Sequence, residues 1–244
     1  MYNNIESGAA WPNQCLCARS AYLLKPDGDP LDPGGFRVLA ILSVIYRLWA
    51  AARLQSLQPW VKHWALDGTC AGLPGVGAED GWYCSSVEME HAKLLGIPFL
   101  GGMVDIWKCF DQILRPLLYC LLSAMGCPLK VITAYISFQE AATYHNSVAG
   151  GLGKAHVRRC GIPQGCPLSM MFIAILMTPW MCFMQTLGIS ARVLADDILL
   201  VGYGDKGHKI FAQALDSTHQ YLIDVGAKVA PDKSLLFEIG RAHV

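Results

Sequence analysis

Charged side chains are scarce in this sequence. They make up 16% of its 244 residues, hydrophobic residues make up 53%, and 19 basic residues balance 19 acidic ones. A net charge of zero gives no global argument for binding to nucleic acid or to an anionic membrane, so any basic surface has to be local. The apolar content predicts a substantial core, in one sizeable domain or two small ones, and surfaces that another part or partner covers.

Signals for export and for a cysteine-based metal site are lacking as well. The N-terminus has no signal-peptide pattern, and the ten cysteines are scattered through apolar segments without paired spacing. We therefore expect reduced, buried thiols in an intracellular protein. The glycine-rich stretch 68–81 is not followed by the Gly-Lys-Ser/Thr of a phosphate-binding loop, so it predicts an ordinary loop.

One apolar segment, residues 167–189, is nearly long enough to span a bilayer. It begins with a Gly/Pro loop, contains Pro179 and Gln185, and has no basic flanks. These features favour a core helix, and a membrane protein built on this segment is the alternative.

The chain is organised around residues 193–199, which read Val-Leu-Ala-Asp-Asp-Ile-Leu. Two apolar runs flank the adjacent acids Asp196 and Asp197, which predicts a hairpin with the acids at or beside its bend. Like charges so close repel each other, and a bound cation would relieve the repulsion. Carboxylate oxygens suit Mg²⁺ or Mn²⁺. Considered alone, the segment favours a solvated Asp-Asp turn over a cation site.

Several other segments place further candidate residues. The buried strand predicted over 99–104 delivers Asp105 at its end, where an acid is either a catalytic group or a helix N-cap. A hairpin over 22–42 carries Lys25 and Arg37 on neighbouring arms, where they are solvated or bind a phosphate. A second hairpin, 144–157, leads into the basic cluster of Lys154, His156, Arg158 and Arg159, which could be a solvated face.

The remaining elements are mostly helices. Ser43 is expected to begin a helix that Pro59 stops, and Asp205 to cap a helix that ends at Gly226. Residues 1–20 show no hydrophobic period and are expected to form a poorly defined N-terminal segment.

Together these pieces resemble a reverse transcriptase palm of the retrotransposon (non-LTR) or group II intron type. The resemblance covers about residues 20–239 and rests on motifs in a fixed order: Lys25 with Arg37 in the fingers hairpin, Gly72-Leu73-Pro74-Gly75 in the linker, Asp105-Ile106-Trp107-Lys108-Cys109-Phe110-Asp111 as first catalytic motif, Gly161-Ile162-Pro163-Gln164-Gly165 as positioning motif, Leu194-Ala195-Asp196-Asp197 as second catalytic motif, and Gly226 to Ser234 with Lys233.

The sequence departs from the family pattern at four places. Leu194 stands where an aromatic residue is usual, and Val38 where a proline is expected after the fingers arginine. No thumb domain follows the Lys233 motif, and the last five residues match nothing, so both ends of the chain look truncated. The resemblance implies an α+β fold: a palm with an antiparallel sheet backed by helices over 99–239, partial fingers with the palm connection over 21–98, and an unassigned tail over 240–244.

The resemblance also implies a mechanism, RNA-directed DNA synthesis by two-metal nucleotidyl transfer onto a primer 3′-hydroxyl. Asp105, Asp196 and Asp197, with the backbone carbonyl of Ile106, would hold two cations about 3.5–4 Å apart. Lys233 would protonate or steady the departing pyrophosphate.

The other site residues follow from the same resemblance. Lys25 and Arg37 would bind the triphosphate, and Gln164 and Gly165 would position the template or nucleotide. Phe110 would exclude a ribose 2′-hydroxyl, unless its ring is simply packed in the core. The implied partners are dNTPs, a primed RNA or DNA template tracked by Lys154, Arg158 and Arg159, and the missing thumb or flanking domains, with no membrane.

Two other functions are compatible with these motifs. A truncated or inactive retroelement remnant would fold and bind nucleic acid without polymerising. Another two-metal enzyme, such as a nuclease, would share the three acids but would not need the segment 161–165.

Overall fold

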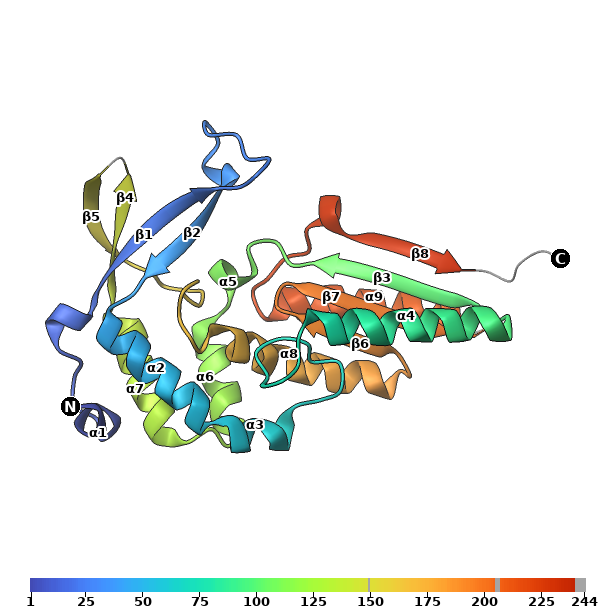
Figure 1. Cartoon of the computed structure of the whole chain (residues 1–244), viewed down its shortest axis with the longest axis horizontal. Coiled ribbons are helices and arrows are strands. Elements are labelled where there is room, and N and C mark those ends of the chain that lie inside the picture. The colour runs from blue at the N-terminus through green and yellow to red at the C-terminus, as the bar shows by residue number, and fades with distance from the viewer. Residues whose placement is uncertain (149, 205–206, 240–244) are drawn as a thin grey trace. The chain divides into compact units, whose positions relative to one another are not determined.

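The computed structural model describes residues 1–148, 150–204 and 207–239. The chain divides into two compact units (Figure 1). The first unit contains Met1–Leu57 and Arg115–Ser169, and the second contains Gln58–Leu114 and Met170–Val244. The predicted tail 240–244 and the predicted helix cap Asp205 lie outside the described residues.

The first unit is a mixed four-stranded sheet with helices. Its elements are α1 (Tyr2–Glu6), η1 (Asn13–Cys15), β1 (Cys17–Leu24), η2 (Pro33–Gly35), β2 (Phe36–Ile41), α2 (Val44–Ser56), α6 (Arg115–Ala124), α7 (Leu129–Ala141), β4 (Thr143–Val148) and β5 (Gly151–Val157). The strand order is β2-β1-β4-β5, in which β1 pairs antiparallel with β2 and parallel with β4. Both predicted hairpins are present, as β1–β2 and β4–β5.

The N-terminal segment differs from the expectation. Residues 1–20 contain α1, η1 and the first half of β1, and Trp11 is 3% exposed. The Trp11 ring packs edge-on against Tyr46, Trp49 and Phe138, and its Nε1 donates to the carbonyl of Ala134 at 2.9 Å. A large aromatic side chain thus anchors a segment without hydrophobic period, and Ile5 is buried in the core as well.

The second unit is a four-stranded antiparallel sheet with helices on both faces. Its elements are α3 (Gln58–Trp64), α4 (Ala78–Leu95), β3 (Phe99–Asp105), α5 (Cys109–Gln112), α8 (Ser169–Thr186), β6 (Ser190–Leu194), β7 (Asp197–Tyr203), α9 (Gly207–Asp224), η3 (Pro231–Lys233) and β8 (Leu235–Ile239). The strand order is β6-β7-β3-β8.

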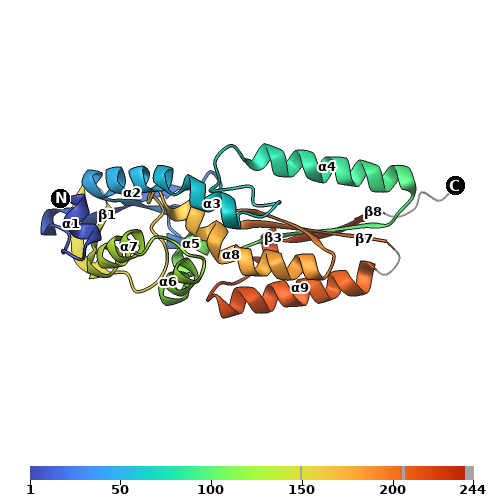
Figure 2. The same cartoon turned by 90° about the horizontal axis from the view of Figure 1, so that it is seen from below.

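Residue alternation along β3 sends its side chains to opposite faces. On one face Phe99 packs with Val201 and with Ala92 of α4. On the other face a side chain at Gly102 would meet Phe211 and Leu215 of α9. Figure 2 shows the sheet strands between α4 and α9. β3 and β7 thus lie between two helical layers, and β3 ends at Asp105 where β7 begins at Asp197.

The helix predicted in the apolar segment 167–189 is confirmed as α8. By length and composition it could cross a membrane, but 61% of it is buried in the structure. Trp180 of α8 donates to Thr218 of α9 at 2.9 Å, and Tyr221 of α9 bonds the carbonyl of Leu176. This burial is the pattern of a core helix, as the sequence favoured.

Two local predictions are wrong. Pro59 does not stop a helix: α2 ends at Ser56, and Pro59 is the second residue of α3, where its missing N–H costs nothing. The cysteines are not uniformly buried, because Cys17, Cys84, Cys120, Cys160 and Cys182 are exposed. Small apolar side chains tolerate partly exposed helix and strand positions, so composition alone did not reveal this.

Candidate active site

The three predicted acids come together at one end of the sheet of the second unit. Asp105 ends β3 and lies directly opposite Asp197, the first residue of β7. Opposed residues of an antiparallel pair project to the same face. Asp196 lies in the turn, and its carbonyl accepts a hydrogen bond from the Ile106 amide at 2.9 Å.

The turn between β6 and β7 has an unusual backbone. Leu194 pairs with Asp197, which leaves Ala195 and Asp196 as a two-residue loop. Ala195 has φ of 58°, a left-handed conformation that is strained for any residue with a Cβ. Glycine would be the usual choice at the first position of such a hairpin turn. No local pattern in the sequence indicates this left-handed residue.

The charges at this end of the sheet repel each other. The pKa of Asp197 is raised, first by partial loss of solvent and then by the neighbouring Asp196 and Asp105, while Lys233 opposes the shift. Lys233 forms an ion pair with Asp105, with its Nζ 3.5 Å from Oδ2. Burial, and then Asp196, Asp105 and Asp111, raise the pKa of the Cys109 thiol, so it stays protonated.

The segment 228–234 holds the end of β3 from its other edge. The amide of Ala230 donates to the Asp105 carbonyl at 2.8 Å, and the amide of Trp107 donates to the Lys228 carbonyl at 2.8 Å. The Asp105 amide donates to Ser234 Oγ at 3.2 Å. Sequence reasoning did not assign a role to Ser234, although it lies beside Lys233 in the last motif. The main chain around Asp105 is therefore fixed on both sides.

Carboxylate oxygens fit a hard divalent cation by their chemistry. Within residues 1–148, 150–204 and 207–239, however, no group of three or more His, Cys, Asp or Glu side chains is already gathered as a metal site. Asp105 is engaged by Lys233. A cation would therefore have to draw the acids together and compete with this lysine.

Phe110 lies five residues beyond Asp105, in the short helix α5. Its ring is half-buried and does not belong to the buried core. Lys108, which precedes α5, has φ of 45°, and its Nζ lies 4.9 Å from the centre of the Trp107 ring. The structure thus leaves Phe110 partly accessible, as a residue that contacts a ligand must be.

The predicted phosphate ligands belong to the first unit. Arg37 is exposed on β2, opposite Leu23. Lys25 directly follows β1, and its Nζ donates to the carbonyl of Gly34 at 2.8 Å. Arg37 thus lies on one arm of the β1–β2 hairpin, as predicted, and Lys25 lies just beyond the other arm.

The segment 161–165 is also in the first unit and is joined to β2. The amide of Ala40 donates to the Gln164 carbonyl at 2.7 Å. Gly165 has φ of 123°, and a Cβ there would lie 2.4 Å from the Ala40 carbonyl oxygen. Only glycine fits this approach. The side chain of Gln164 is half-buried.

The basic cluster follows the β4–β5 hairpin. Lys154 is exposed on β5, whose residues are all exposed, and Arg159 is exposed just beyond it. The guanidinium of Arg158 lies 5.5 Å from the centre of the Tyr144 ring, a cation–π arrangement. The cluster is thus only partly a solvated face, because one of its cations packs on an aromatic ring.

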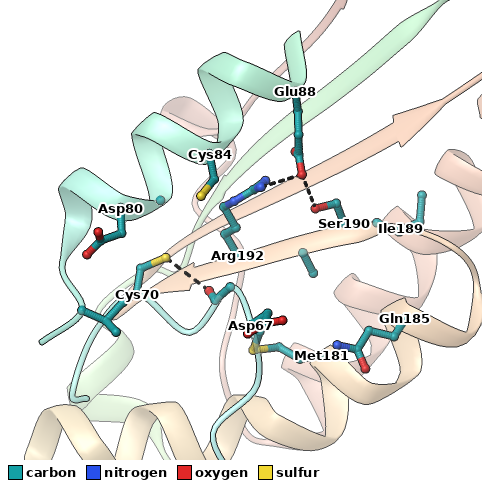
Figure 3. A pocket seen from close by; sticks show the side chains of 14 residues that line it. Asp67, Cys70, Asp80, Cys84, Glu88, Met181, Gln185, Ile189, Ser190 and Arg192 are labelled. Carbon is teal, nitrogen blue, oxygen red and sulfur yellow. Dashed lines mark hydrogen bonds and ion pairs between the residues drawn. The ribbon is translucent and has the colours of Figure 1, made fainter. Parts of the chain in front are cut away.

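A cavity of about 340 Å³ lies between α4 and β6 of the second unit (Figure 3). At its edge Arg192 of β6 forms an ion pair with Glu88 of α4 at 2.7 Å, and Glu88 also accepts from Ser190 at 3.4 Å. The pKa of Glu88 is lowered, because these bonds and one from Tyr203 outweigh its burial. These contacts tie α4 to β6 and β7, the two strands joined by the turn that contains Asp196.

The predicted site residues thus fall into two groups. Asp105, Ile106, Phe110, Asp196, Asp197 and Lys233 are in the second unit, and Lys25, Arg37, Lys154, Arg158, Arg159, Gln164 and Gly165 are in the first. Within each group the structure gathers residues that are far apart in the sequence.

The family model described as reverse transcriptase (RNA-dependent DNA polymerase) matches residues 23–240. Among solved structures, telomerase from Candida tropicalis in complex with a TWJ fragment of telomeric RNA has a TM-score of 0.66 and 15% identity, over 96% of this chain and 42% of that one. The apo Candida tropicalis telomerase truncated from its C-terminal domain also has a TM-score of 0.66 and 15% identity, over 97% of this chain and 53% of that one.

Telomerase from Candida albicans, again with a TWJ fragment of telomeric RNA, gives a TM-score of 0.63 at 15% identity, over 99% of this chain and 45% of that one. The chain spans about half the length of these structures. At 15% identity this structural similarity shows the fold alone. It confirms the predicted α+β architecture of palm and fingers.

Proposed function

Because this chain belongs to the reverse transcriptase (RNA-dependent DNA polymerase) family, we propose that it is the catalytic core of an RNA-directed DNA polymerase. It would add deoxynucleotides to a primer 3′-hydroxyl. The observation that carries the proposal is the meeting of Asp105 and Asp197 as cross-strand partners, with Asp196 in the adjoining turn.

The three acids would hold the divalent cations, Mg²⁺ or Mn²⁺, together with the carbonyl of Ile106. When bound, such cations activate the primer hydroxyl and neutralise charge on the triphosphate. Partial burial, and then repulsion from Asp196 and Asp105, raise the pKa of Asp197, and a bound positive charge would relieve the repulsion among these three acids. Lys233, released from Asp105, would protonate or steady the departing pyrophosphate.

The other roles are those of recognition. Lys25 and Arg37 would bind the triphosphate through charge-assisted hydrogen bonds, and Gln164 would contact the template or nucleotide. The ring of Phe110 would lie against the sugar and exclude a 2′-hydroxyl. Lys154, Arg158 and Arg159 would track the nucleic-acid backbone.

We propose RNA as the natural template and a retrotransposon or group II intron as the source of the chain. The linker sequence Gly72-Leu73-Pro74-Gly75 supports that source. The telomerases of similar fold were solved with a fragment of telomeric RNA, which supports an RNA partner. The fingers, palm and tail boundaries given above, and an intracellular location, belong to the same proposal.

Primer extension tests the function. The chain is incubated with Mg²⁺, the four dNTPs and a labelled DNA primer annealed to an RNA template, at low ionic strength because the net charge of zero predicts weak binding to duplex. We expect the primer to lengthen by DNA complementary to the template. Binding without extension would instead support an inactive remnant, and shortened strands would support a nuclease.

A further inference from the structure

A buried arginine lies behind the segment Gly161–Gly165, in the first unit. Arg115, the first residue of α6, is 1% exposed. Its Nε donates to the Gly161 carbonyl at 2.9 Å, and its Nη1 donates to the Gln139 carbonyl at 3.1 Å. The nearest acid is Glu140, half-exposed, with Oε1 3.6 Å from Nη1. A guanidinium is costly to bury, and here the carbonyls of Gly161 and Gln139 accept hydrogen bonds from it.

The other end of the segment is held through Gln139, which belongs to helix α7. Gln139 accepts from Arg115 through its carbonyl and donates from its side-chain Nε2 to Tyr46 Oη at 3.4 Å. Tyr46 Oη lies 3.1 Å from Cys166 Sγ. Burial raises the pKa of the Cys166 thiol to about 11, so this contact joins neutral groups. Gln139 therefore links the residues at both ends of the segment.

The middle of the segment is fixed by β2. The Gln164 carbonyl accepts the Ala40 amide at 2.7 Å, and Gly161 has φ of 80°, so the chain turns sharply where Arg115 bonds it. With Gly161, Gln164 and Cys166 all anchored, the backbone has little freedom to change the direction of the Gln164 side chain.

We infer that Arg115 is a positioning residue for Gln164. Its bond to the Gly161 carbonyl sets the conformation of the segment that presents Gln164 to the template or nucleotide. The functional part of this inference rests on the proposed polymerase function. Its structural part, the dependence of residues 161–166 on the Arg115 guanidinium, does not.

The test uses Arg115→Lys, with Arg192→Lys as a matched control. Arg192 is also a buried arginine with a single glutamate partner, but it lies in the second unit. Amide hydrogen exchange is measured by mass spectrometry in the wild-type protein and both variants. A lysine cannot make both forked bonds, so Arg115→Lys should speed exchange about tenfold or more in residues 161–166 and at Ala40, since a buried carbonyl loses its charged donor.

The control should leave exchange in residues 161–166 and at Ala40 unchanged. Unchanged exchange there in Arg115→Lys, or an equal increase in both variants, would overturn the inference.

Kinetics then tests whether Arg115 acts through Gln164. Losses in kcat/KM for dNTP incorporation from Arg115→Lys and Gln164→Ala should be strongly non-additive, because the two changes disrupt one arrangement. Losses from Arg192→Lys and Gln164→Ala should add. Additive losses in the first pair would show that Arg115 only stabilises the fold and would refute the positioning role. If the wild-type chain incorporates nothing, the proposed polymerase function fails, and the exchange experiment alone decides the inference.

Discussion

Removing one of the clustered negative charges should stabilise the protein. Asp105 and Asp197 are direct cross-strand partners, and such residues have Cβ atoms about 4.5–5.5 Å apart. Two unit charges at about 5 Å repel by about 3 kcal/mol at an effective dielectric constant of about 20. Asp197 is exposed and Lys233 lies beside Asp105, so solvent and the lysine screen most of this. We expect Asp197→Asn to raise the free energy of unfolding by about 0.5–1.5 kcal/mol at pH 7 and low salt.

The effect should depend on pH with a defined sign. Partial burial, and then Asp196 and Asp105, raise the pKa of Asp197 in the folded state, so the folded protein keeps this proton to higher pH than the unfolded chain. The repulsion is therefore absent below the usual carboxyl pKa of about 4 and grows as the pH rises through the raised value. The higher free energy of unfolding of Asp197→Asn, relative to wild type, should therefore be present at pH 7 and vanish at low pH.

Urea unfolding followed by circular dichroism measures this difference, with and without Mg²⁺. Magnesium should stabilise the wild-type protein more than Asp197→Asn, because the cation relieves the same repulsion. Asp216→Asn, which removes an exposed acid on α9, is the control and should show no dependence on Mg²⁺. The reasoning is refuted if Asp197→Asn is less stable than wild type at pH 7, or if its advantage is the same at both pH values.

Three further substitutions test other parts of the account. Ala195→Gly should stabilise the fold by about 0.5–1 kcal/mol, since relief of a left-handed conformation outweighs the added freedom of the unfolded chain; a lower urea midpoint would contradict the strain. Phe110→Val should raise ribonucleotide relative to deoxyribonucleotide incorporation at a stability cost below about 2 kcal/mol, and an unchanged sugar preference would leave only a packing role. Trp11→Ala should destabilise the first unit by about 3–5 kcal/mol, and a loss under 1 kcal/mol would contradict the role of Trp11 as an anchor of the N-terminal segment.

Local sequence patterns predicted the elements that carry the site. The β6–β7 hairpin follows from two apolar runs around Asp196 and Asp197, and β3 from the apolar run before Asp105. Alternation and punctuation by glycine and proline suffice for such elements, because each buries side chains along its own length.

Features that depend on long-range contacts could not be predicted from the sequence, for a physical reason. The burial of Trp11 depends on Tyr46, Trp49 and Phe138, which are remote in the chain, and no local period marks it. The left-handed Ala195 depends on the register that pairs Leu194 with Asp197. Likewise, nothing in the sequence near Arg115 indicates that its guanidinium reaches the Gly161 carbonyl. These contacts are decided by packing between elements, not by propensity within them.

The central claim is that Asp105, Asp196 and Asp197 form one divalent-cation site for nucleotide addition. Its most direct test is single-nucleotide incorporation with Mg²⁺ on a primed RNA template, comparing wild type with Asp196→Asn after unfolding curves show that both are folded. We predict incorporation by the wild-type protein and its complete loss in Asp196→Asn, because one carboxylate ligand is replaced by a neutral amide. Near-normal incorporation by a folded Asp196→Asn would contradict the claim.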